Sequence, residues 1–278
     1  MHHIVILVHR HFTFDNSRYF LSEIIEIWQK EGLRVSVLNG LGTRVDADLA
    51  ILHVDLTVVP EDYLAFIRQY PVTINGSVTD ISKRRISSNL VCRGDGYQGQ
   101  VVVKTNNNCR GGCESETASR GTLLKKYTNS LRSRLPWSWQ AKLSDYPIYE
   151  SVSQVPRAVW HNPDLIVEQF LPERRDGFYC LRTWVFLGDK ESNSVSYSDQ
   201  PIVKSNNILR HEKVAEVPDE LRQMRRDLAF DYGKFDYAIV NGRVILYDTN
   251  RTPTMGSLSK EKLLPTIRLI AGGIQAYL

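Results

Sequence analysis

Residues 4–8, Ile-Val-Ile-Leu-Val, form an unbroken apolar run that constrains the fold more than any other feature of the chain. A strand that is apolar at every position has both faces buried, which is typical of a parallel sheet covered by helices. Apolar strands and helical patterns alternate over about the first 80 residues, which predicts a small doubly wound βαβ unit. The further predicted strands are 35–38, 49–53 and 72–75, and the predicted helices are 17–31 and 60–70.

The pattern changes beyond residue 100, where strands tend to follow one another with Gly-rich and Asn-rich turns between them. Asn241-Gly242 predicts a hairpin between residues 235–240 and 243–247. The basic stretch 117–144 is expected to be helical or irregular. We interpret it as a solvated insertion with Trp137 and Trp139 docked on the core, or alternatively as a surface for an anionic macromolecule or a peptide. Other strands are predicted at 101–104, 165–167 and 182–187, and helices at 220–230 and from residue 260.

Length and charge limit the class of protein. A chain of 278 residues suits one two-lobed domain or two domains, and 42% hydrophobic residues exclude a mostly disordered chain. The net charge of +4 suits a polyanionic ligand such as a nucleotide without requiring nucleic acid as a partner.

Four cysteines are too few for a disulfide scaffold, and no apolar run reaches the length of a membrane span. The start lacks the longer apolar run of a secretory signal, so we expect a cytoplasmic protein without a membrane partner. A homodimer is compatible with the sequence, which leaves the oligomeric state open.

Asp236, Asp248 and Asn250 could form a metal site on the predicted hairpin. Two carboxylates and an amide oxygen make a hard, oxygen-only ligand set of the kind that binds magnesium. Asp248 and Asn250 are two residues apart on one strand, so their side chains share a face. For a lone Asp-x-Asn, however, solvated strand ends are the more common explanation.

Asp236 joins that face under one condition only. A two-residue Asn241-Gly242 turn would place Asp236 opposite Tyr247, on the wrong face, whereas a three-residue loop shifts the register by one and brings the three side chains together. The sequence permits both turns, and we expect the metal clamp to depend on which one forms.

Lys104 ends the buried strand 101–104, and a polar loop containing Gly111 and Gly112 follows it. Such a loop can present backbone N–H groups to phosphates, with the lysine adding a point charge. The alternative is an ordinary hairpin turn. Farther along, residues 165–173 run from an apolar strand into an acidic turn, and Arg182 lies inside an apolar strand where it needs an anionic partner or solvent.

Together and in this order, these segments resemble the ATP-grasp superfamily, in particular RimK-like and glutathione-synthetase-like carboxylate–amine ligases. The resemblance covers most of the chain. It implies an α/β fold with an N-terminal βαβ domain and two α+β subdomains that hold ATP between antiparallel sheets. The implied boundaries are 1–92 for the N-terminal domain and 93–278 for the ATP-grasp domain, divided into 93–170 (lid and central subdomain) and 171–278 (metal-binding subdomain).

The resemblance also implies roles for individual residues. Arg182 and Lys104 would contact the transferred phosphoryl group, the main chain around Gln169 and Phe170 would read adenine, and Glu168 or Glu173 would bind the ribose. The implied ATP contacts are Lys83, Lys104, Gly111, Gly112, Glu168, Gln169, Phe170, Glu173 and Lys204, and the implied metal ligands, for Mg²⁺ or Mn²⁺, are Asp236, Asp248 and Asn250. Lys204 could equally be an ordinary surface lysine.

The implied reaction activates a carboxylate as an acyl phosphate, which an amine (or a thiol) of a small molecule or peptide then attacks. A kinase that phosphorylates a hydroxyl and a nucleotide-binding module without turnover are the alternatives. The chain departs from the superfamily in having Asp248 where a glutamate is usual, Lys83 only 21 residues before Lys104, and Arg251 where a small residue or proline is common.

His9 and His11 follow the first strand, at the edge where ligands of open α/β sheets bind. We treat these histidines and Arg251 as candidate substrate contacts, with ordinary loop residues and a turn cap as the alternatives. Cys109 and Cys113 lie in the predicted lid, and a zinc site would need ligands that the sequence does not reveal, so we expect free thiols.

Overall fold

The computed structural model describes all residues except 1, 13, 15–18, 120–133 and 257–259. Its first unit is the predicted parallel sheet, with strand order β2-β1-β3-β4. Every residue of β1 is buried, because helices cover both faces of the sheet. The strands are β1 (His3–Val8), β2 (Arg34–Asn39), β3 (Leu49–His53) and β4 (Val72–Ile74), and the helices are α1 (Phe20–Lys30) and α2 (Glu61–Ile67).

A small antiparallel sheet forms the middle of the chain, in the order β6-β5-β7. Val101 and Val103 of β5 pack into a local core with apolar side chains of β7, whereas Val102 and Lys104 point to the opposite face. This second face is the one that lines the site described below. The elements are α3 (Lys83–Ile86), β5 (Val101–Thr105), η1 (Cys109–Gly111), α4 (Gly112–Ser119), η2 (Trp137–Trp139), β6 (Ile148–Tyr149), η3 (Val152–Gln154), η4 (Arg157–His161) and β7 (Leu165–Gln169).

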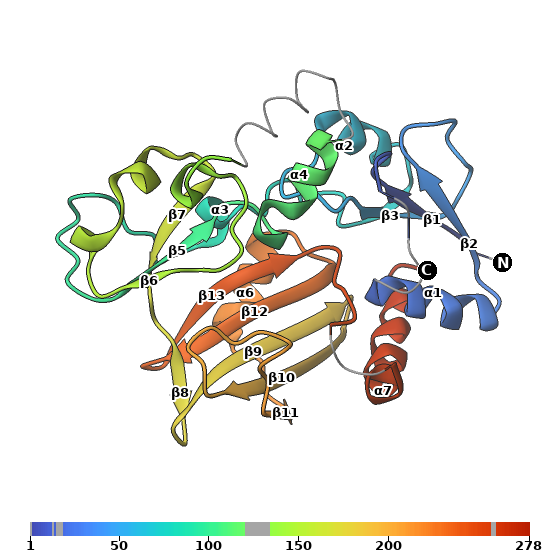
Figure 1. The fold of residues 1–278 in the computed structure, drawn as a ribbon. Helices are drawn as coiled ribbons and strands as arrows, with labels where there is room; N and C mark the ends of the chain where they lie inside the picture. The colour runs from blue at the N-terminus through green and yellow to red at the C-terminus, as the bar shows by residue number, and fades with distance from the viewer. Residues whose placement is uncertain (1, 13, 15–18, 120–133, 257–259) are drawn as a thin grey trace.

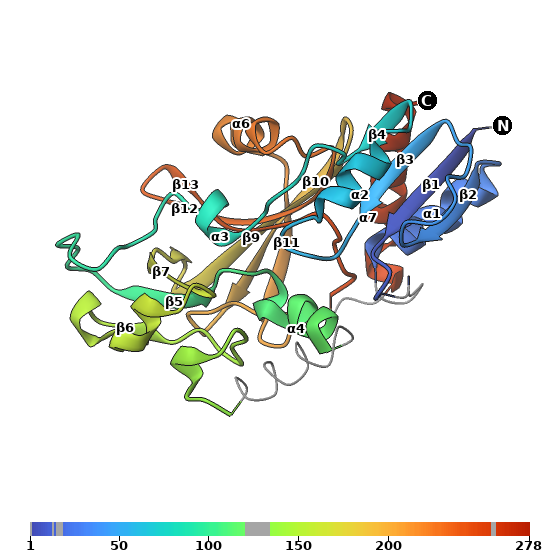
Figure 2. The same ribbon diagram turned by 90° about the horizontal axis from the view of Figure 1, so that it is seen from above.

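The largest sheet is antiparallel and has the order β11-β10-β9-β12-β13, with β8 pairing with β9 (Figure 1). Helix α6 covers one face of it, and the middle sheet lies over the other (Figure 2). The elements are β8 (Glu173–Arg175), β9 (Phe178–Leu187), β10 (Lys190–Ser198), β11 (Arg210–Val214), α6 (Asp219–Asp227), β12 (Tyr232–Val240), β13 (Arg243–Asn250), α7 (Lys260–Ala271) and η5 (Gly272–Ala276).

The two ends of the chain share one core. Ile267 and Ile270 of α7 pack with α1 and β1, and the indole of Trp28 donates to the carbonyl of Ala271 at 2.9 Å. Asn75, at the end of β4, accepts from the backbone N–H of Tyr232 at 3.0 Å and donates to its carbonyl at 2.7 Å. The N-terminal sheet is therefore fixed to the large sheet, and the domain boundaries given above stay a prediction.

The structure describes the basic stretch 117–144 only in part. Residues 120–133, which carry most of its charge, lie outside the described residues. Trp137 packs against the middle core as expected, but Trp139 is 46% exposed, so the expectation that both aromatics dock is wrong for Trp139. No helix of the described residues is long and apolar enough to cross a bilayer.

Candidate functional site between the two antiparallel sheets

Asp236 and Asp248 lie directly opposite each other on β12 and β13, but not for the expected reason. The hairpin has the two-residue Asn241-Gly242 turn, with Val240 paired to Arg243. The register then shifts between Tyr237 and Asp236, because Tyr247 is an extra residue on β13. This β-bulge moves Asp248 onto the face of Asp236. The expectation that a two-residue turn breaks the clamp is therefore wrong.

Each of the two carboxylates has a lysine beside it. Lys234 Nζ lies 2.9 Å from Asp236 Oδ2, and the Thr183 hydroxyl donates to Asp236 Oδ1 at 2.9 Å. Lys83 Nζ lies 3.3 Å from Asp248 Oδ1. Burial favours the neutral amine, but the adjacent carboxylates outweigh it and hold the pKa of Lys83 and of Lys234 above the usual lysine value. Both lysines are therefore cationic at neutral pH.

Asn250 shares the face of Asp248 but is already engaged. Its side-chain oxygen accepts from the Thr252 backbone N–H at 2.8 Å and from the Thr252 hydroxyl at 3.1 Å. An amide oxygen has two lone pairs, so a metal ion would have to replace one of these bonds. Its role as a ligand stays a prediction.

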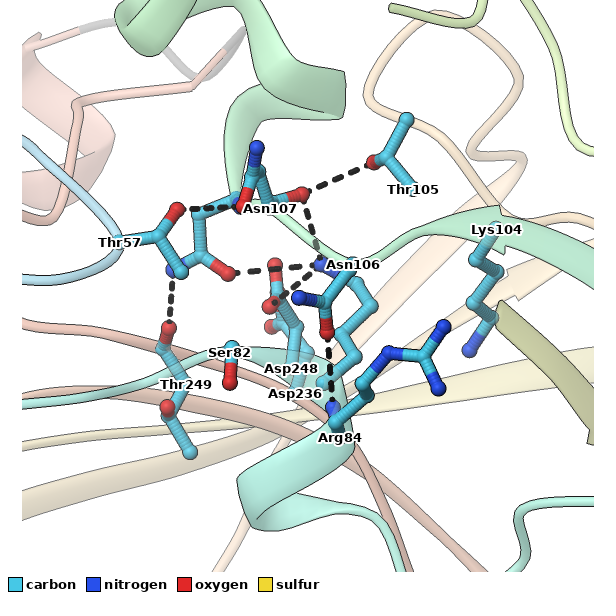
Figure 3. Close-up of polar contacts among 12 residues, drawn as sticks. Thr57, Ser82, Arg84, Lys104, Thr105, Asn106, Asn107, Asp236, Asp248 and Thr249 are labelled. Carbon is cyan, nitrogen blue, oxygen red and sulfur yellow. Dashed lines mark hydrogen bonds and ion pairs between the residues drawn. The ribbon is translucent and has the colours of Figure 1, made fainter. Parts of the chain in front are cut away.

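Lys104 approaches the carboxylates from the middle sheet, at the end of β5. Its Nζ lies 2.7 Å from Glu168 Oε2 and 5.0 Å from the centre of the Tyr247 ring. Figure 3 shows Asp236 and Asp248 next to each other, with the Asn106–Asn107 turn and Lys104 around them. Lys83 belongs to the same group, since its Nζ also donates to the Asn107 carbonyl at 3.3 Å.

These side chains line one cavity between the middle and large sheets. Its wall is apolar toward β7 and the loop after β10, and charged toward the ends of β5 and β13. The apolar side includes Val102, Phe170, Leu181 and Ile202, and the charged side includes Lys83, Lys104, Asp236 and Asp248. A flat apolar group at one end and a polyanion at the other would match this lining.

Solved structures share this architecture over nearly the whole chain. A RimK-domain ATP-grasp protein from Sphaerobacter thermophilus matches 99% of this chain and 98% of its own, at 12% identity and a TM-score of 0.54. A D-cycloserine synthetase matches 97% of this chain and 99% of its own, at 12% identity and a TM-score of 0.52. The chain has the ATP-grasp fold.

A third structure with the ATP-grasp fold has a peptide bound. It is a RiPP-associated ATP-grasp ligase from Chryseobacterium gregarium, in complex with ADP and a leader and core peptide. It matches 98% of this chain and 96% of its own, at 11% identity and a TM-score of 0.50. No known family model and no curated protein matches the sequence. At these identities the likeness establishes the ATP-grasp fold alone.

Arg182 does not face the cavity of this ATP-grasp fold. It pairs with Tyr237, whereas Thr183 pairs with Asp236, so Arg182 points to the opposite side of the large sheet. There it makes a bidentate ion pair with Glu173, at 2.8 and 2.7 Å. The hydrogen bonds to Glu173 raise the pKa of Arg182. The expectation that Arg182 meets the phosphoryl group is wrong, because its pairing with Tyr237 turns its side chain away from the face of Asp236.

The two acids expected near the ribose are both buried and paired. Glu168 is held by Lys104, and Glu173 accepts from Arg182 and from the backbone N–H of Ile239 at 2.8 Å. Neither side chain lines the cavity, so a ribose contact from them is not supported. Gln169 and Phe170 do line it, at the hinge between the two sheets.

The segment expected to form a phosphate lid is the start of helix α4. Gly111 and Gly112 lie at the junction of η1 and α4, and a side chain at Gly111 would collide with the Ala141 carbonyl. They do not line the cavity, so a phosphate contact stays a prediction. Lys204 Nζ binds Asp145 at 2.8 Å, beside the cavity-lining residues 201–203.

The candidate substrate residues separate into two groups. His9 and His11 line a second cleft at the carboxyl edge of the N-terminal sheet, together with Asn107 and Glu114. Burial, with His11 and Arg10 nearby, lowers the pKa of His9 to about 4, so this ring is neutral at pH 7. Their role as substrate contacts stays a prediction.

Arg251 is not a substrate contact in this structure. It is 1% exposed and donates to the backbone carbonyls of Leu56 at 3.0 Å, Thr57 at 2.8 Å, and Val78. Burial lowers its pKa to about 10. Arg251 thus ties the end of β13 to the N-terminal unit.

Sequence reasoning missed Lys234, Thr183 and Tyr247. Lys234 stands two residues before Asp236, so strand alternation alone puts the two on one face. That spacing was a usable signal. Thr183 and Tyr247 depend on the register of β9 and on the bulge, which the sequence does not specify.

Proposed function

We propose that the protein is an ATP- and magnesium-dependent ligase that activates a carboxylate as an acyl phosphate for attack by an amine. The observation that supports this most is the convergence of Lys83, Lys104, Asp236 and Asp248 in one cavity between two antiparallel sheets. An apolar end for a base and a charged end for phosphates fit a nucleoside triphosphate.

The carboxylates fit a hard divalent cation. Asp236 and Asp248 present oxygen ligands from neighbouring strands. Asp248 Oδ1 is buried, and among the residues that the structure describes its one donor is the ammonium of Lys83 beside it. Magnesium, when bound, would neutralise charge on the phosphates; manganese has similar ligand preferences. Asn250 would complete the set if Thr252 released its oxygen.

The chain's own residues would mainly supply charge and position. Lys104 and Lys83 line the cavity and would contact phosphate oxygens, and Lys234 would add a positive charge beside Asp236. Phosphoryl transfer of this kind needs charge neutralisation and alignment, and no covalent enzyme nucleophile.

The bond changes follow from the proposed reaction. A substrate carboxylate oxygen bonds to the γ-phosphorus as the bond to the β,γ-bridging oxygen breaks, and ADP leaves. The amine nitrogen then bonds to the carbonyl carbon, inorganic phosphate leaves, and the nitrogen gives up a proton.

Hydroxylamine trapping tests the proposal. The protein is incubated with ATP, magnesium and pools of amino acids or peptides, with and without hydroxylamine. Hydroxamate formation supports an acyl phosphate and thus a ligase. ADP release that occurs only with a polyol acceptor would show that the protein is a kinase and not a ligase. ATP binding without ADP formation in any substrate pool would contradict both enzyme activities.

Asp248→Asn tests the site itself. It keeps the shape of the side chain but removes the charge, so we expect magnesium-dependent turnover to fall by at least about a hundredfold. Because Asp248 also neutralises buried Lys83, its unfolding free energy is measured in parallel. The matched control is Asp227→Asn, at an exposed position of α6. Full activity of Asp248→Asn would remove the site assignment.

We also propose domain boundaries, a substrate class, an oligomeric state and a location for the protein. The boundaries 1–92, 93–170 and 171–278, a small-molecule or peptide substrate pair, a homodimer and a cytoplasmic location all await measurement. The peptide bound to the Chryseobacterium ligase motivates the inclusion of peptides in the substrate pools.

A further inference from the structure

Three side chains from distant parts of the sequence meet beside the phosphate end of the cavity. The ligand atoms of Asp55, Cys109 and Cys113 all lie within 4.8 Å of one another. Asp55 follows β3, Cys109 begins η1, and Cys113 is in the first turn of α4. Neither cysteine forms a disulfide, and Asp55 is a candidate third ligand that the sequence did not reveal.

Two hydroxyl donors hold the Asp55 carboxylate in place. The Tyr19 hydroxyl donates to its Oδ2 at 3.0 Å, and the Thr252 hydroxyl donates to its Oδ1 at 2.8 Å. A carboxylate oxygen can accept more than one bond, and metal-binding carboxylates are usually hydrogen-bonded in this way. The side chain is 8% exposed, so its position is fixed by the fold.

The two cysteines are brought toward Asp55 by bonds on either side of them. The Asn108 backbone N–H donates to the Thr57 hydroxyl at 2.9 Å, and Glu114 accepts from the Thr57 backbone N–H at 2.8 Å. Thr57 therefore fixes the residues just before Cys109 and just after Cys113. Residues 109–111 all have positive φ angles, so the turn between η1 and α4, rather than helical spacing, brings the two thiols together.

We propose that Asp55, Cys109 and Cys113 bind one thiophilic divalent cation, with Zn²⁺ the best match, and leave a fourth position to water or a substrate group. Two thiolates and one carboxylate are ligand types that zinc uses, and three protein ligands with one open position is an arrangement that zinc accepts. The thiols lose their protons on binding, so the solution takes up protons as the cation binds.

This site differs in chemistry from the one at Asp236 and Asp248. That pair offers only oxygen, which favours magnesium, whereas sulfur favours zinc over magnesium. The proposal does not rest on the ligase function. A cation here would link the N-terminal unit to α4, which begins just after the Asn106–Asn108 turn against Lys83.

Cobalt titration of the full-length protein tests the proposal directly. Metal-free protein is kept reduced and titrated with Co²⁺ in excess Mg²⁺, which occupies oxygen-only sites. One equivalent should produce the thiolate-to-cobalt charge-transfer absorption and the visible bands of a tetrahedral site, and Zn²⁺ should bleach both. Asp55→Asn should weaken the affinity by about tenfold or more while the thiolate absorption remains.

Cysteine variants supply the matched comparison. Cys109→Ser should about halve the charge-transfer intensity, and the Cys109→Ser/Cys113→Ser double variant should abolish it. Cys92→Ser, at an exposed position elsewhere, should leave it unchanged. Failure to bind one equivalent, or a thiolate absorption that survives in the double variant, overturns the proposal.

Alkylation of the wild-type protein tests the proposal without requiring that any variant folds. Cys109 and Cys92 are both exposed, so both react with iodoacetamide in the metal-free protein. One equivalent of Zn²⁺ should slow the modification of Cys109 at least tenfold and leave Cys92 unaffected, as measured by peptide mass spectrometry. Equal rates for Cys109 with and without Zn²⁺ would contradict the proposal.

Discussion

Arg251 and Arg182 are the residues whose roles depend most on their surroundings. Both were candidates for contact with a ligand, and both prove to be buried with all-protein partners. Arg182 is paired with the carboxylate of Glu173, whereas Arg251 donates hydrogen bonds to backbone carbonyls of the N-terminal unit. Lys234, by contrast, points into the site with Asp236. The partners of each buried cation therefore show whether it lies on the cavity side of the sheet or ties parts of the fold together.

Arg251→Met tests the structural role of this side chain. The change removes the guanidinium donors to three backbone carbonyls, of which the Thr57 carbonyl keeps the Ile81 N–H, so we expect the free energy of unfolding to fall by about 3 kcal/mol. Urea denaturation measures the loss, with Arg243→Met, at an exposed position of β13, as the control. A variant of normal stability with a raised KM for the substrate would restore the substrate-contact interpretation.

His53 makes stability depend on pH. It is buried against Tyr19 and Phe14, and burial, only partly offset by Asp55, lowers its pKa to about 4. The unfolded chain takes up a proton near pH 6.5 and the native state does not, so stability falls as the pH drops from about 6.5 toward 4.

His53→Phe removes this proton uptake while keeping an aromatic ring. The slope of unfolding free energy against pH should fall by roughly 1.4 kcal/mol per pH unit over that window. Urea denaturation at a series of pH values measures it, with exposed His161→Phe as the control. An unchanged slope in His53→Phe would show that the native histidine is protonated.

At the level of elements, position along the chain was easier to predict than the direction of side chains. The parallel strands of the N-terminal unit and the hairpin of β12 and β13 were predicted from apolar periodicity and turn residues. The phase of β9 and the bulge at Tyr247 were not. A shift of one residue reverses every side chain of a strand, and long-range pairing sets that shift.

The variant Gly242→Ala tests whether the turn or the bulge sets the register of β12 and β13. Gly242 has a φ of 78°, where a side chain costs about 1 kcal/mol, so the melting temperature should fall by a few degrees. Hydroxamate formation should persist, because the bulge at Tyr247 sets the pairing of Asp236 with Asp248. Gly272→Ala, with open space and no positive φ, is the control. Loss of activity without unfolding would show that the turn sets the register.

At the level of the whole molecule, the first and last helices depend on each other. α7 packs on α1, and its side chains join those of β1 and β3 in one core. Leu187 and Tyr232 of the large sheet enter the same core, so the N-terminal unit and the large sheet bury a common apolar surface. We therefore expect the two to unfold together.

Ile270→Ala tests this coupling. The side chain is fully buried, so truncation should lower the free energy of unfolding by about 3 kcal/mol in a single transition. Trp28 and Trp184, in different cores, report the unfolding by fluorescence. Leu269→Ala, at a position 45% exposed on the same helix, should change little. Two separate transitions in the variant would contradict a shared core.

The sequence by itself determined the strands and helices of the N-terminal unit, the hairpin of β12 and β13, the cavity-lining residues Lys104, Asp236 and Asp248, and the resemblance to a fold that the structure confirms. Those features are local, since they depend on periodicity, turn residues and residue type. Tertiary structure alone decided that Arg182 faces away from the cavity, that Asp248 pairs with Asp236, that Arg251 is buried against backbone carbonyls and that Asp55 meets two thiols. Strand register, a one-residue bulge and contacts between distant segments determine these, and none of them is encoded within a short stretch of sequence.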